Sequence, residues 1–184
     1  LGDVRFDAQT GDFYREHIEL PFFNYFLKDK GKQELPEAYM FETGTNQWHK
    51  FEAWPPKSTI SQSLYLHAGG ELVFDRPPAS PGGFDEYISD PAKPVPSTPG
   101  LAPGMAQRYM VDDQRFAARR TDVLVYQTAV LEEDVTVAGP IVSSLHVSTS
   151  GTDSDWIVKL IDVYPDLFPD LKGDVKNSLG AYQQ

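Results

Sequence analysis

Residues 119–166 read RRTDVLVYQTAVLEEDVTVAGPIVSSLHVSTSGTDSDWIVKLIDVYPD and contain three runs typical of β-strands. The runs are 122–128, 141–148 and 156–164, and they are rich in the β-branched and aromatic residues that suit a pleated surface. The turn-like pair Gly139-Pro140 and the polar segment 149–155 separate them. Short strands between turn signals predict a β-sandwich or jelly roll.

The same stretch resembles a known family. The motifs R-x-D-V-L-V, L-x-x-D-V-x-V-A-G-P and S-T-S-G-T-D-S-D-W-x-V-K-L-I-D-V-Y-P follow one another in it. They resemble the C-terminal β-sandwich of the X-Pro dipeptidyl-peptidase and cocaine esterase (CocE/NonD) group of serine hydrolases. Upstream, residues 39–55 (YMFETGTNQWHKFEAWP) and 63–70 (SLYLHAGG) are most similar to α-amino acid ester hydrolases and glutaryl-7-aminocephalosporanic acid acylases of that group.

The resemblance implies a mainly β chain in two parts. Residues 1–32 would be the last helix of an α/β-hydrolase domain, and residues 33–184 a galactose-binding-like, jelly-roll β-sandwich. We expect this fold to be incomplete at both ends, with a catalytic domain before the chain and further strands after it. The catalytic histidine motif of the family precedes the position where this sequence starts, so no catalytic residue is carried over.

Composition sets broad limits. The 184 residues suffice for one domain with a core, or for one domain plus part of another. Apolar residues make up 40% and charged residues 23%, as in ordinary globular proteins. The net charge of −11 argues against a nucleic-acid partner. No apolar run approaches the roughly 18 residues of a membrane span, and no cysteine is present for a disulfide or a thiolate site.

An amphipathic helix is predicted over residues 13–27. Ile18, Phe22 and Phe26 recur at a spacing of four, beside a second apolar stripe. Thr10 or Asp12 is the expected cap, and Pro21 predicts a kink or two short helices. The helix alternatively covers one face of the sandwich.

The remaining elements follow from turn signals. Residues 38–41 predict a strand, and residues 63–74 a hairpin around Gly69-Gly70. The Pro- and Gly-rich residues 76–104 predict a surface excursion in which 84–89 form an edge strand. Propensity leaves residues 105–118 open between helix and strand. A loop is expected at 167–173, and the start of a further strand at 175–184.

Two tryptophans, Trp48 and Trp54, are candidates for a binding function. Trp48 and Trp54 could stack on carbohydrate, as in binding modules of similar architecture. Tryptophan is, however, buried on average, so packing in the core or between domains is the favoured interpretation.

No catalytic set is evident in the sequence. It lacks the G-x-S-x-G elbow that a serine hydrolase of this class needs. The four histidines are His17, His49, His67 and His146. A set of His146, Ser148 and Asp155 can be drawn but lacks an elbow and an oxyanion loop, and Ser150 and Ser178 lie on no strand–turn–helix pattern. Our prediction is therefore no catalytic and no cofactor-binding residue in this chain.

Carboxylates crowd the C-terminal third, where they could bind calcium or act as turn residues. They are Asp153, Asp155, Asp162, Asp166, Asp170 and Asp174. The spacing lacks a complete calcium-loop pattern, so turns are favoured and no metal ligand is assigned. Arg120 is expected to pair with Asp122, Asp153 or Asp155, and docking of a catalytic domain is a further hypothesis for this arginine.

The sequence therefore predicts the non-catalytic C-terminal part of a serine hydrolase. Its parent would act on α-amino acid esters or amides, β-lactams included, or on X-Pro peptides, and this part would support the catalytic domain and wall its cleft. Two alternatives stay open, a free-standing carbohydrate-binding jelly roll and a subunit that assembles with a separate catalytic chain. The oligomeric state and compartment also stay open, although the resemblance implies a periplasmic or secreted enzyme.

Overall fold

The computed structural model describes residues 6, 8–78, 83–101, 104 and 107–168. Contacts divide the chain into two compact units. The smaller unit comprises Arg5–Ser61 and Thr136–Val142, and the larger unit comprises Leu1–Val4, Gln62–Val135 and Ser143–Gln184. The predicted strand at 175–184, most of the predicted loop at 167–173, and Asp170, Asp174 and Ser178 lie outside the described residues.

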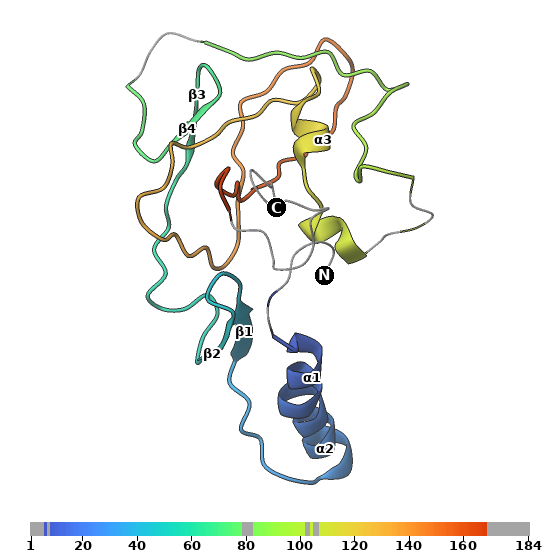
Figure 1. Cartoon of the computed structure of the whole chain (residues 1–184), viewed down its shortest axis with the longest axis vertical. Coiled ribbons are helices and arrows are strands. Elements are labelled where there is room, and N and C mark those ends of the chain that lie inside the picture. The colour runs from blue at the N-terminus through green and yellow to red at the C-terminus, as the bar shows by residue number, and fades with distance from the viewer. Residues whose placement is uncertain (1–5, 7, 79–82, 102–103, 105–106, 169–184) are drawn as a thin grey trace. The chain divides into compact units, whose positions relative to one another are not determined.

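The smaller unit begins with one long helix in three parts. These are α1 (Thr10–Tyr14), a π-helical turn (Arg15–Glu19) and α2 (Leu20–Lys28). A kink or two short helices were predicted at Pro21, and the helix consists of two α-helical segments joined by a π turn that ends just before this residue (Figure 1). Pro21 has no N–H to donate to the preceding turn, and a wider turn just before it accommodates the missing donor. The predicted caps are wrong, since Gln9 occupies the cap position without a side-chain hydrogen bond.

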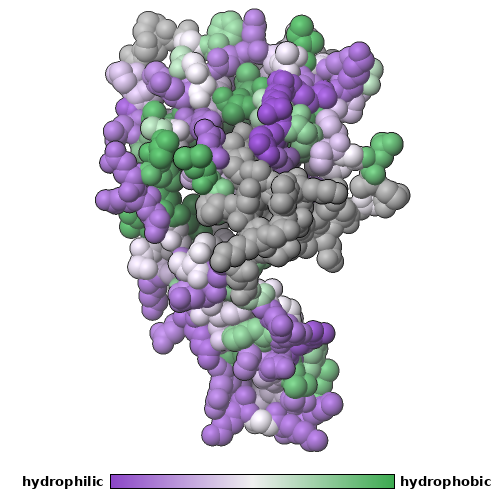
Figure 2. All heavy atoms as spheres, viewed as in Figure 1, coloured by the Kyte–Doolittle hydropathy of each residue, from purple (hydrophilic) through white to green (hydrophobic). Residues whose placement is uncertain are grey.

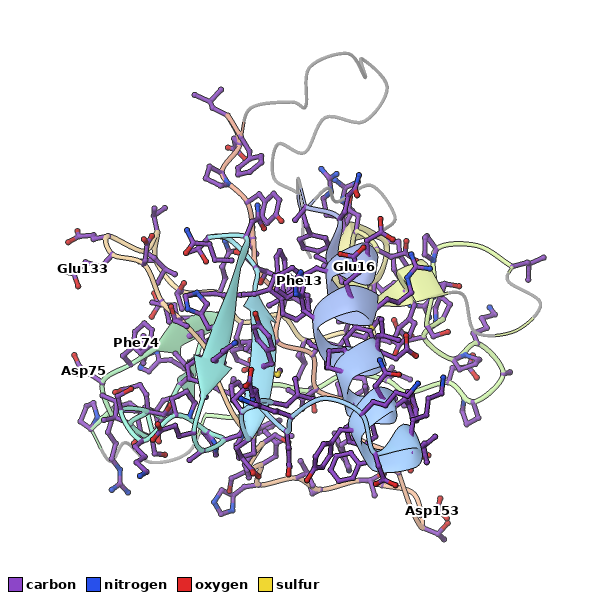
Figure 3. The ribbon with its side chains drawn as sticks, turned by 90° about the horizontal axis from the view of Figure 1, so that it is seen from below. Phe13, Glu16, Phe74, Asp75, Glu133 and Asp153 are labelled. Atoms are coloured by element: carbon purple, nitrogen blue, oxygen red, sulfur yellow. The ribbon has the colours of Figure 1, made fainter. Side chains whose placement is uncertain are left out.

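An antiparallel hairpin lies beside this helix. Strand β1 (Ala38–Glu42) pairs with β2 (Gln47–Phe51), so that Phe41 faces Trp48 across the ladder. Gly44 and Asn46 adopt positive φ in the turn, at +90° and +56°. Phe13 of α1 stacks on Trp48 with 4.7 Å between ring centroids and an interplanar angle of 16°. In Figure 3 Phe13 lies between the helix and the strands.

The segment Thr136–Val142 completes the smaller unit, although it is distant in sequence. Thr136 donates a hydrogen bond from Oγ1 to Glu42 Oε1 at 3.4 Å. Gly139 packs so closely on Pro55 that a Cβ at this position would lie 2.7 Å from the Pro55 Cγ.

The larger unit contains the hairpin predicted at 63–74. Strand β3 (Tyr65–His67) pairs antiparallel with β4 (Glu71–Val73). Gly69 and Gly70 have φ of +88° and +80°, so the prediction of a glycine turn is confirmed. Gln127 joins β4 by a parallel bridge to Glu71, with Leu72 N donating to Gln127 O and Gln127 N donating to Gly70 O, both at 2.9 Å.

The strands predicted at 84–89, 122–128, 141–148 and 156–164 are not regular strands in the structure. Within these segments only Gln127 and Val163 are assigned as isolated bridge residues. Strand propensity measures how well side chains suit a pleated surface, and a ladder also needs a neighbour in register. The prediction of regular strands here is therefore wrong.

A small buried group lies where the sequence left the structure open. A 3₁₀ turn (Gln107–Val111) and the short helix α3 (Arg115–Ala118) flank it. Val111, Asp112 and Gln114 are the buried side chains among the described residues. Gln114 donates to the Asp112 carbonyl at 2.7 Å and accepts from Lys159 Nζ at 2.8 Å.

The architecture confirms the predicted fold class. The chain is of the mainly β class: its described residues are mostly non-helical, with two antiparallel hairpins and an amphipathic helix near the N-terminus. None of the helices among the described residues is long and apolar enough to cross a membrane.

Candidate functional site

The histidines are the first candidates for chemistry, and among the described residues none of them belongs to a nucleophile–base–acid set. His17 is on the π turn, where its ring lies 4.4 Å from that of Phe13. A shallow hollow beside it is lined by Ala8, Gln9, Asp12, Phe13, Glu16, His17 and Trp48, and none of these is a serine. His17 therefore faces carboxylates and aromatic rings without a nucleophile.

Two other histidines each lie close to a glutamate of the same hairpin. His49 Nε2 lies 2.9 Å from Glu42 Oε2, and His67 Nδ1 lies 3.4 Å from Glu71 Oε2. Each pair joins neighbouring strands and is partly exposed. Such pairs stabilise a hairpin slightly. The hydroxyl beside the first pair, Thr136 Oγ1, donates to Glu42 rather than to His49.

The set of His146, Ser148 and Asp155 that can be drawn on the sequence is not assembled. All three residues are exposed, and in the part of the chain that the structure describes no hydrogen bond links them. Ser150 lies in a bend in which Gly151 N donates to Thr149 Oγ1 at 3.1 Å. That contact is typical of a polar turn.

The acidic residues do not converge either. Within the described ranges, no three His, Asp or Glu side chains are placed to hold a metal ion. Asp153 and Asp155 are exposed in their loop, and Figure 3 labels Asp153 at the edge of the view.

Trp48 belongs to an aromatic cluster. Its ring contacts Phe13, Tyr39 and Phe41, with centroid distances of 4.7, 5.5 and 5.5 Å. Phe13 stacks on one face of the indole, so that face is not open to a sugar. Trp54 packs against Phe51 at 5.6 Å and stays 42% exposed.

The apolar face of α2 is the first feature that points outward. Phe22, Phe23 and Phe26 contact one another within the helix, yet they are 43%, 47% and 51% exposed. The side chains of Leu20 and Leu27 on the same helix are also exposed. Figure 2 shows apolar atoms at the surface of the helical part among hydrophilic ones. Contiguous apolar surface of this kind marks an interaction site.

A guanidinium clamp is the second feature, and it lies in the larger unit. Arg120 donates two hydrogen bonds to Asp122, from Nε at 2.7 Å and from Nη2 at 2.6 Å, which matches one of the predicted partners. Its Nη2 also donates to the carbonyl of Lys93 at 3.1 Å. The hydrogen bonds to Arg120 lower the pKa of Asp122, and those to Asp122 raise the pKa of Arg120.

The third feature is a contact between Tyr126 and Asp85, which was not predicted from the sequence. The Tyr126 hydroxyl donates to Asp85 Oδ2 at 2.6 Å. Burial and then this hydrogen bond raise the pKa of Tyr126 to about 12. The two residues are 41 positions apart, so no local signal could have paired them.

Comparisons with known proteins find similar sequences and a similar structure. A model of the family described as the X-Pro dipeptidyl-peptidase C-terminal non-catalytic domain matches residues 30–181. Cocaine esterase of Rhodococcus sp. (strain MB1 Bresler) is 34% identical over 144 residues, which are 72% of this chain and 24% of that protein.

A solved structure is similar over the whole chain. It is an aminopeptidase from a marine sediment archaeon, Thaumarchaeota archaeon, with a TM-score of 0.81 and 41% identity. The match covers 100% of this chain and 30% of that protein. The chain thus spans between about a quarter and a third of the length of these relatives.

Proposed function

Because the chain belongs to the X-Pro dipeptidyl-peptidase C-terminal non-catalytic domain family, we propose that it is the supporting C-terminal part of a serine hydrolase. On this proposal, residues 33–184 form the jelly roll and residues 1–32 contribute the last helix of an α/β-hydrolase domain in the same polypeptide. That domain supplies the serine, histidine and acid. The jelly roll packs on it and helps to wall its cleft.

The exposed apolar face of α2 is the observation that carries this proposal. Burying a phenylalanine side chain is worth about 1.5–3 kcal/mol, so three half-exposed ones gain much from a partner surface. The last helix of an α/β-hydrolase domain would have such a surface beside it, because helices cover the sheet in that fold. The absence of a nucleophile elbow from the sequence fits the same division of labour.

The proposed reaction is acyl transfer through a serine acyl-enzyme. The names of the two relatives refer to an ester substrate and to peptides. We infer that the substrate is an ester or amide of an α-amino acid, a class that includes both kinds of bond. Acyl β-lactams and X-Pro peptides are the specific candidates.

A substrate panel tests this. The natural polypeptide that contains residues 1–184 should hydrolyse phenylglycine methyl ester or an X-Pro anilide faster than acetyl esters that lack an amino group. Equal rates on all of them would contradict the substrate proposal. A saturable change in tryptophan fluorescence with glycans, together with no hydrolysis, would favour a carbohydrate-binding module instead.

A further inference from the structure

The excursion between the second hairpin and the helical turns contains a segment that is held at both ends. We call residues 84–93 the strap. At one end Asp85 accepts the hydrogen bond of Tyr126 at 2.6 Å. At the other end the Lys93 carbonyl accepts from Arg120 Nη2 at 3.1 Å, and Arg120 is itself oriented by Asp122.

Further contacts order the strap near Lys93 and in its middle. Ala92 N donates to Asp90 Oδ1 and Lys93 N donates to Asp90 O, both at 2.9 Å, which forms a tight turn. The ring of Tyr87 meets that of Trp156 edge-on, with 6.2 Å between centroids. Polar contacts and one aromatic contact thus order a segment that has no strand or helix of its own.

The strap nevertheless leaves its largest apolar side chains in water. Phe84 is 83% exposed and Ile88 is 86% exposed. Ordering a segment costs conformational entropy, and apolar groups that stay exposed do not offset this loss. A segment that is already ordered binds a partner more tightly, because less freedom is lost on association.

We propose that the strap is a preformed docking element for the hydrolase domain, which receives Phe84 and Ile88 in an apolar hollow bordered by Lys or Arg side chains. The inference rests on the proposed function, because it needs that domain. The larger part of each relative lies outside the region shared with this chain, which provides an occupant. The strap contains three carboxylates (Asp85, Glu86 and Asp90) and one cation (Lys93). Its net negative charge favours a basic border.

A matched pair of substitutions in the natural polypeptide tests the docking. Ile88→Glu places a carboxylate in the strap, and Val130→Glu places one at a 92% exposed apolar position of the same unit outside it. Ile88→Glu should lower the Tm by about 2–4 °C, while Val130→Glu should leave the Tm within the scatter of surface substitutions. Equal Tm values for the two variants would overturn the proposal.

Two further readouts separate the alternatives. Arg120→Lys removes the forked contact, so the strap should lose protection in hydrogen exchange. Unchanged protection would contradict the clamp.

If the wild type is a dimer in light scattering and Ile88→Glu is a monomer, the occupant is a second copy and the proposal fails. Equal Tm values in an enzyme that still reacts with a serine-directed probe contradict the docking alone, whereas an unreactive protein contradicts the proposed function.

Discussion

Gly139 is the residue at which backbone conformation and packing coincide. Its φ is +93°, in a region that favours glycine, and Pro55 leaves no room for a Cβ. Gly139→Ala should therefore lower the free energy of unfolding by about 1–3 kcal/mol, measured by urea denaturation. Gly100→Ala is the control, because Gly100 has no heavy atom within 4 Å of a Cβ and no positive φ. Equal effects of the two substitutions would contradict this role for Gly139.

Tyr126 gives a pH-dependent prediction at the same scale. Its pKa in the folded chain is raised from 10.0 to about 12, so folding favours the neutral phenol. The stability that this provides is fully present below pH 10 and is lost as the pH rises through 12. Tyr126→Phe should cost about 0.5–1.5 kcal/mol near pH 8 and remove the loss of stability between pH 10 and 12. An unaltered alkaline profile in the variant would rule out the contact with Asp85 as its origin.

Helix α2 raises the question of what covers its apolar face. If the face lies inside a hydrolase domain, Phe26→Ala in the natural polypeptide should cost about 3–5 kcal/mol of stability, the usual cost for a buried phenylalanine. If α2 is a surface helix, its exposed side chains should matter by about 0.5 kcal/mol. Lys28→Ala on the same exposed helix is the control. Thermal unfolding of both variants distinguishes the two arrangements.

The elements also show which parts of the fold the sequence predicts. The hairpin at 63–74 was predictable because Gly69-Gly70 is a local signal for its turn, and the helix was predictable from its apolar period. The structure of segment 122–128 was not predictable in this way, because its pairing depends on a partner far away in sequence.

The same distinction applies to the candidate surfaces. The apolar stripe of α2 can be read from its spacing in the sequence. The pairing of Arg120 with Asp122 was expected, since the two residues are neighbours. The contacts that hold the strap were not, because Asp85 and Lys93 lie 41 and 27 residues from their partners. Their pairing follows from tertiary structure alone.

At the scale of the molecule, the chain combines ordered units with much exposed apolar surface. The described residues include few buried side chains, while Phe, Ile, Leu and Val side chains of both units are exposed. A protein that functions alone rarely exposes so much apolar surface. On the proposed function, packing on a larger hydrolase covers the apolar face of α2 and the strap.

The most direct test of this account is to find the serine that reacts with a fluorophosphonate probe in the natural polypeptide. The polypeptide is labelled, its intact mass is measured, and the modified peptide is mapped by mass spectrometry. The account predicts a mass several-fold above the 20.6 kDa of this chain, with one labelled serine outside residues 1–184 of the same polypeptide. A labelled serine within these residues, or a 20.6 kDa protein that takes up no label, would contradict it.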